Sequence, residues 1–137
     1  MVGTLVALML ASSPGLQPPL AEQFAAHLVK LEQRGGPPAS IMYGVAWVET
    51  GGTFNPRTRG RAGEVGIWQI HPVHHPPSGW TAQMDWAAAH LMGLKKKAGG
   101  SMATALAAYN GGWGGRNKAV CKRYARRVLA KAGRVKR

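Results

Sequence analysis

Residues 41–52 read IMYGVAWVETGG, an apolar segment that ends in a glutamate, a threonine and two glycines. An apolar run of this length, preceded by prolines at positions 37 and 38, predicts a helix. The glycine pair ends this helix because glycine readily takes the left-handed conformation that follows a helix C-terminus. The segment therefore predicts an apolar helix with Glu49 in its last turn.

Glu49 stands out among only five acidic residues in the chain. Apolar neighbours and the negative end of the helix dipole both disfavour an ionised carboxylate at this place. Both effects should raise its pKa, as a proton donor that works near neutral pH requires. The residues alone leave open a second interpretation, in which Glu49 is an ordinary exposed residue at a helix end.

Two other carboxylates are candidates for chemistry. Glu64 lies in a basic, glycine-rich loop, where it is either a second catalytic carboxylate or an ion-pair partner of Arg59 or Arg61. Asp85 follows the start of a predicted helix, where the helix dipole stabilises a negative charge.

The rest of the chain is predicted to be mainly helical, as one domain over residues 20–137. Apolar spacing and glycine or proline breaks place helices at about 20–34, 81–97, 101–110 and 117–132, with Thr81, Ser101 and Asn117 as N-caps. Cys121 falls on the apolar stripe of the last helix and is expected to be buried there. Residues 64–70, EVGIWQI, are the one segment that looks extended.

Residues 1–19 form an apolar N-terminal segment with two interpretations. The run from Val2 to Ala11 is followed by small residues, as in a secretory signal, but no Lys or Arg precedes it. A short helix that docks on the domain explains the same pattern. The run is too short to span a bilayer, which takes ~20 apolar residues.

The charge of the chain is unusual and uneven. Eighteen Lys and Arg face five Asp and Glu, and thirteen of these basic residues lie in residues 95–137, which contain no acid. This basic C-terminal region predicts a polyanionic partner, which can be nucleic acid, anionic lipid or an acidic cell-wall polymer. A basic nucleic-acid-binding helical protein is therefore one alternative, although zinc-ligand spacing, a basic zipper and an aromatic RNA-binding motif are missing from the sequence.

Three motifs in order carry a family resemblance. They are AWVETGGTFNPR at 46–57, AGEVGIWQIHP at 62–72 and ALAAYNGG at 105–112. Together they resemble the signatures of the soluble lytic transglycosylase domain, in the lysozyme-like superfamily, over about residues 37–130. Trp68 stands where the family has methionine, and Glu64 stands where it commonly has a small or apolar residue.

The resemblance implies a lysozyme-like fold, mainly α, with a small extended or hairpin segment near 64–70 flanking the active-site cleft. It implies that Glu49 is the acid/base that cleaves the β-1,4 bond after N-acetylmuramic acid in peptidoglycan glycan strands, and that Gln69, Tyr109 and Asn110 surround the substrate. One carboxylate is enough for a 1,6-anhydro product, whereas Glu64 or Asp85 as a second carboxylate would allow hydrolysis. We expect no cofactor or metal, a monomer, and a periplasmic, extracellular or phage-associated setting.

Three further features of the sequence accompany the matching motifs. Trp113, between two glycine pairs, either stacks on a sugar or packs against the protein. Four histidines, His71, His74, His75 and His90, are separated by prolines and a helix and are not expected to bind a metal. The basic residues of the last helix are expected to hold the protein on anionic wall polymer.

Overall fold

The computed structural model describes residues 1–136, which form six α-helices and two short 3₁₀ helices without a sheet. The elements are α1 (Val2–Ser12), α2 (Pro18–Gln33), α3 (Ala39–Thr50), η1 (Pro72–His74), α4 (Trp80–Lys97), α5 (Met102–Gly111), η2 (Trp113–Gly115) and α6 (Ala119–Ala132). The predicted fold class, mainly α in a single small domain, is confirmed.

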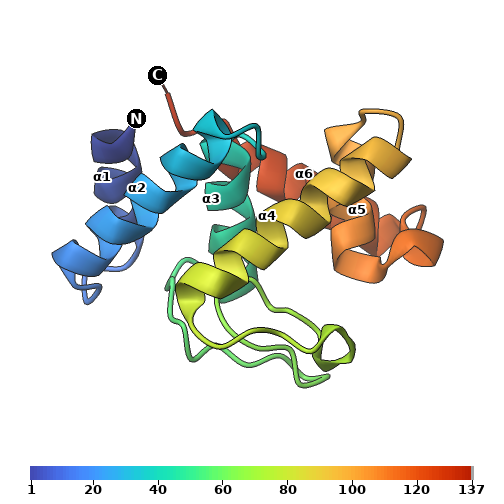
Figure 1. Cartoon of the computed structure of the whole chain (residues 1–137), viewed down its shortest axis with the longest axis horizontal. Helices are drawn as coiled ribbons and strands as arrows, with labels where there is room; N and C mark the ends of the chain where they lie inside the picture. The colour runs from blue at the N-terminus through green and yellow to red at the C-terminus, as the bar shows by residue number, and fades with distance from the viewer. Residues whose placement is uncertain (137) are drawn as a thin grey trace.

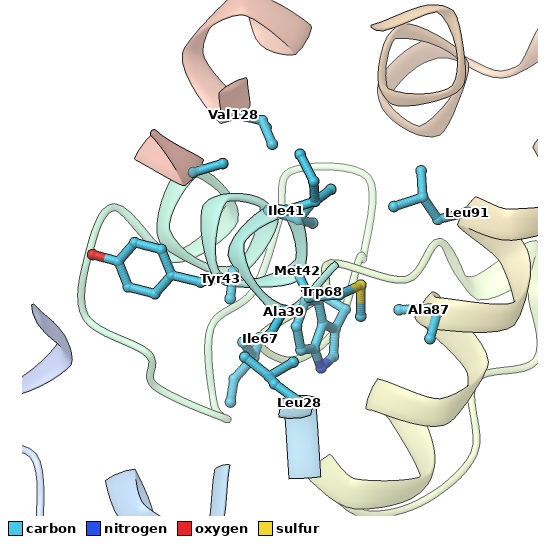
Figure 2. Packing of buried hydrophobic residues seen from close by; sticks show 14 of the residues in the cluster. Leu28, Ala39, Ile41, Met42, Tyr43, Ile67, Trp68, Ala87, Leu91 and Val128 are labelled. Carbon is cyan, nitrogen blue, oxygen red and sulfur yellow. The ribbon is translucent and has the colours of Figure 1, made fainter. Parts of the chain in front are cut away.

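Helix α3 occupies the middle of the molecule, with α1 and α2 on one side, α4 and α5 on the other, and α6 behind it (Figure 1). Residues 41–46 of α3 are all buried. Figure 2 shows their neighbours: Leu28 of α2, Leu91 of α4 and Val128 of α6 surround the helix. The apolar run of α3 is therefore explained by burial on every side.

A carboxylate and a pair of glycines define the two ends of α3. At its start, the Ala39 backbone N–H donates to the Glu32 carboxylate at 3.1 Å, which satisfies one of the free donors of the first turn. At its end, Gly51 and Gly52 take left-handed φ angles of 63° and 83°. The glycine pair thus ends the helix as predicted.

Helices α3 and α6 cross in close contact at Gly44. A Cβ atom on this glycine would lie 2.6 Å from the Val128 backbone oxygen, so a larger residue does not fit. The predicted stripe of α6 faces this crossing, and Cys121, Tyr124 and Val128 are all buried. This confirms the packing role predicted for Cys121.

Helix starts agree with the predictions to within two residues. The Ser101 side chain accepts a hydrogen bond from the Thr104 backbone N–H at 3.1 Å, so the predicted N-cap of α5 is confirmed. The predictions for Thr81 and Asn117 were wrong, because Gly79 precedes α4 and Lys118 precedes α6. The reason in the first case is that Trp80 joins the helix and packs on Phe24, with ring centroids 5.8 Å apart.

The segment 64–70 is a tight turn and not an extended strand. Val65 and Ile70 pair as an isolated antiparallel bridge, with backbone hydrogen bonds of 3.1 Å in both directions. Between them, Gly66 and Gln69 take positive φ angles of 79° and 48°, which bend the chain back on itself. A second bridge joins Arg59 and Val65, so the small extended or hairpin segment predicted near the cleft is reduced to two isolated bridges.

Helix α1 packs against α2 and is built into the core, where Leu5 and Met9 are buried. The Ser12 hydroxyl donates to the Gly52 backbone oxygen at 3.0 Å, so the end of α1 is tied to the turn that follows α3. This packing supports the docking-helix interpretation of residues 1–19, which stays a prediction. Within residues 1–136, no helix combines the length and apolar character needed to cross a membrane.

Replacing Gly44 with alanine should lower the free energy of unfolding by about 1–3 kcal/mol, because the new methyl group would press on the α6 backbone. Gly93 of α4 is the matched control: it is exposed, and a Cβ there would meet nothing within 4 Å. Gly93→Ala should raise stability by up to about 1 kcal/mol through helix propensity. Urea unfolding measures both variants, and changes of the same sign would contradict the close crossing.

Candidate active site

A pocket of about 260 Å³ opens at the end of α3. Its walls come from α3, the 60–71 loop, η1, α4 and the end of α5. The lining residues are Glu49, Glu64, Gln69, Ile70, His71, His74, Trp86, His90, Tyr109 and Asn110. Four of the five residues predicted around Glu49, namely Glu64, Gln69, Tyr109 and Asn110, therefore meet in one place.

Glu49 reaches the pocket because α3 ends directly after it. The neighbouring Thr50 points the other way: its hydroxyl donates to the Ala46 backbone oxygen at 2.8 Å and accepts from the Phe54 backbone N–H at 3.0 Å. This hydroxyl fixes the chain after the helix, where Phe54 is buried with a positive φ of 52°. The carboxyl group of Glu49 is thus held by a rigid helix end.

The surroundings of Glu49 favour its protonated form. Burial raises the pKa of Glu49 from 4.5 to about 8, the nearby Tyr124 hydroxyl lowers it, and the Glu64 carboxylate raises it further. The Tyr124 hydroxyl is buried without a close hydrogen-bond partner among the described residues, so its donation to Glu49 is a loose contact. Burial has the largest effect on this pKa, so Glu49 holds a proton at neutral pH.

Glu64 faces the same pocket and approaches Gly60. A Cβ atom on Gly60 would overlap the Glu64 carboxylate and would lie 2.7 Å from the Gln69 side-chain oxygen. Among the residues that the structure describes, Glu64 makes no ion pair, so the pairing considered for Arg59 or Arg61 is not formed. The lack of a side chain at position 60 is what leaves room for this carboxylate.

Asp85 lies elsewhere on the molecule. Its carboxylate contacts the His27 ring nitrogen at 2.6 Å, and its side chain is 54% exposed. It does not line the pocket of Glu49. The geometry therefore leaves Glu64 as the carboxylate that accompanies Glu49.

Gln69 and Tyr109 hold the walls of the pocket together. The Gln69 side-chain amide donates to the backbone oxygens of Thr58 at 3.0 Å and Gly66 at 2.7 Å, which closes the 58–69 loop. The Tyr109 hydroxyl donates to the Trp68 backbone oxygen at 2.7 Å, which joins α5 to this loop. Both residues line the pocket and also keep it in shape, whereas sequence reasoning placed them only around a substrate.

Asn110 and Trp113 follow Tyr109 but differ in position. Asn110 is exposed at the pocket, with its side-chain nitrogen 3.5 Å from the buried Cys121 sulfur. Trp113 does not line this pocket. The side chains of Arg116 and Lys97 both lie over its ring, at 4.1 and 4.6 Å from the ring centroid, which is a cation–π arrangement.

Several pocket residues were missed by the sequence reasoning. Trp86 and His90 lie four residues apart on α4, and this spacing could have placed them on one face. Tyr124 of α6, which is not part of the pocket lining, also contacts Glu49, and no local sequence pattern predicts this contact. Within residues 1–136, no three His, Cys, Asp or Glu side chains come together as possible metal ligands.

The outer face of α6 is basic. Lys122, Arg123, Arg126 and Arg127 are all exposed there, and residues 95–137 contain no acid to neutralise them. Their charge therefore projects into solvent, where it can attract an anionic polymer.

Comparison with protein families matches residues 28–129 to the transglycosylase SLT domain. The match extends from the second half of α2 almost to the end of α6, and so includes every residue that lines the pocket. A search of curated proteins finds no match.

The buried state of Glu49 predicts a pH-dependent stability. The folded protein keeps the Glu49 proton up to a pH of about 8, whereas the unfolded chain releases it near the ordinary value of 4.5. The free energy of unfolding should therefore fall as the pH rises through this interval, and level off above it. Each tenfold difference in proton affinity between the folded and unfolded chains is worth about 1.4 kcal/mol at most, and less where water reaches the carboxyl.

Glu49→Gln has no such proton, so its stability relative to the natural protein should increase across the same interval. Urea unfolding at several pH values measures the difference. Parallel pH profiles for the two proteins would contradict the buried, protonated carboxyl.

Proposed function

The chain belongs to the transglycosylase SLT domain family, and from this premise we propose that it cleaves the β-1,4 bond between N-acetylmuramic acid and N-acetylglucosamine, with Glu49 as acid and base. The family degrades peptidoglycan by breaking glycosidic bonds. The observation that carries the proposal is that Glu49, whose pKa is raised to about 8 by burial, lines the pocket at the end of α3. A carboxylic acid that stays protonated at neutral pH is what a leaving sugar oxygen needs as its proton donor.

The reaction proceeds in two parts. Glu49 first donates its proton to the bridging oxygen, and the bond from this oxygen to C1 of N-acetylmuramic acid breaks while positive charge develops on the sugar ring. The resulting Glu49 carboxylate then takes the proton of the same sugar's C6 hydroxyl. The C6 oxygen bonds to C1, which gives a 1,6-anhydro end and returns the proton to Glu49.

Hydrolysis is the second candidate reaction, and the position of Glu64 favours it. Glu64 lines the pocket with Glu49 and, within the described chain, has no cationic partner that would occupy its carboxylate. A carboxylate so placed could activate water for attack at C1, which would give a reducing end. We rank the anhydro product first because the family is one of transglycosylases.

The basic face of α6 gives the proposed enzyme a second contact with its substrate. We propose that Lys122, Arg123, Arg126 and Arg127 hold the protein, as a monomer, on anionic wall polymer through screened electrostatic attraction. Because peptidoglycan is its proposed substrate, we expect the protein to act in the periplasm, outside the cell or as part of a phage particle. A nucleic-acid partner has the charge of α6 as its sole support.

Glu49→Gln should reduce the release of soluble fragments from purified peptidoglycan by at least about 100-fold, because the amide keeps the shape of the side chain but cannot donate the proton. Glu22→Gln is the matched control, since Glu22 is exposed on α2 outside the pocket and should leave the rate unchanged. Circular dichroism checks that both variants fold. A folded Glu49→Gln protein with nearly natural activity would refute the role of Glu49.

Glu64→Gln distinguishes the two reactions when the fragment ends are identified by mass spectrometry. If Glu49 works alone, the natural protein should yield 1,6-anhydro ends, and Glu64→Gln should keep most of its activity and the same product. Reducing ends from the natural protein, lost in Glu64→Gln, would instead establish hydrolysis with Glu64 as the second carboxylate.

A further inference from the structure

One wall of the pocket is a row of aromatic rings that the proposed reaction does not use. Trp86 and His90 project from the same face of α4, with ring centroids 4.6 Å apart and planes 23° apart. His74 of η1 contacts both, at 5.1 Å from Trp86 and 5.2 Å from His90. The row ends at Tyr109 of α5, 5.8 Å from His90. All four rings line the pocket that contains Glu49.

The ring nitrogens of this row are free to bind a ligand, whereas the Tyr109 hydroxyl already donates to the Trp68 backbone oxygen. Within residues 1–136, the side-chain nitrogens of His74, Trp86 and His90 make no hydrogen bond with the protein. The Trp86 indole nitrogen is not among the buried unpaired atoms, so solvent reaches it. The row therefore offers both flat apolar surfaces and hydrogen-bonding nitrogens to the pocket.

A sugar ring matches this combination. Its axial C–H groups form apolar faces that pack on aromatic planes, while its hydroxyl and acetamido groups need hydrogen-bond partners at the edge. Burial and the neighbouring His74 lower the pKa of His90, so its imidazole is neutral at neutral pH and keeps one acceptor nitrogen. A neutral ring stacks on a sugar without the cost of removing a charge from water.

We propose that His74, Trp86 and His90 form an aromatic wall that binds an N-acetylamino sugar of the glycan strand beside Glu49. This inference rests on the proposed function for the identity of the substrate. Trp86 supplies the largest stacking surface of the wall, and the two histidines that contact it extend this surface and hold the indole in place. These three residues are binding and positioning residues, and they transfer no proton in the reaction.

Binding of a β-1,4-linked N-acetylglucosamine tetramer, measured by calorimetry, tests the wall. The assay uses the full chain with Glu49→Gln, so that cleavage does not interfere. Adding Trp86→Ala should weaken binding by about 3- to 10-fold, the range expected for loss of one aromatic contact. Trp86→Phe keeps a ring and should retain most of the affinity. His74→Ala, at an exposed position, should weaken binding by about 2- to 3-fold.

Trp80→Phe is the matched control, because Trp80 lies on the same helix but outside the pocket of Glu49. The affinity of this variant for the tetramer should equal that of the Glu49→Gln protein, which is the parent in this assay. No binding by the parent, or undiminished binding by a folded Trp86→Ala variant, would overturn the wall. If Trp86→Ala does not fold, undiminished binding by His74→Ala would overturn it.

The binding and cleavage assays together distinguish a failure of the aromatic wall from a failure of the proposed function. Peptidoglycan cleavage by the natural protein together with tetramer binding that ignores Trp86 would remove the wall alone. Tetramer binding that depends on Trp86, with no cleavage of peptidoglycan by the natural protein, would keep the sugar site and remove the reaction.

Discussion

The contact of Gly44 with the α6 backbone determines where Glu49 lies. Since a Cβ at position 44 would be 2.6 Å from the Val128 oxygen, the two helices can approach this closely only at a glycine. The same crossing brings Tyr124, one turn before Val128, to the Glu49 carboxyl. A helix buried on all sides then presents one ionisable group at its end, where burial outweighs the other influences on its pKa.

Side-chain hydrogen bonds to the loops around α3 hold the pocket of Glu49 open. Gln69 closes the 58–69 loop on itself, and Tyr109 binds that loop to α5 through the Trp68 backbone oxygen. The Ser12 hydroxyl fastens the turn after Glu49 to α1. These bonds satisfy backbone oxygens that a loop without a sheet would otherwise leave to water. The same side chains that satisfy the hydrogen-bonding needs of the loop backbone therefore also give the pocket its shape.

The sequence predicted the helices well because their apolar spacing and glycine ends are local signals. The glycine pair after Thr50 correctly predicted that Glu49 lies at the end of α3. The prediction that apolar surroundings raise the pKa of Glu49 also agrees with the structure. The sequence prediction failed at residues 64–70, where β-branched and aromatic residues favoured an extended chain and Gly66 and Gln69 turned it back. The aromatic row was missed because it joins three elements, and no local pattern records which helix faces meet.

The pocket combines an acid and a base that are both uncharged at neutral pH. Burial acts on them in opposite directions: it raises the pKa of Glu49 and lowers that of His90, because in each case it disfavours the charged form. The chain around them carries a net charge of +13, which gathers in residues 95–137 and reaches solvent on α6. Charge for attracting a polyanion is thus kept on an outer helix, outside the pocket that holds Glu49. A uniformly basic pocket would stabilise the Glu49 carboxylate and lower its pKa, and the proton that the proposed cleavage requires would be lost.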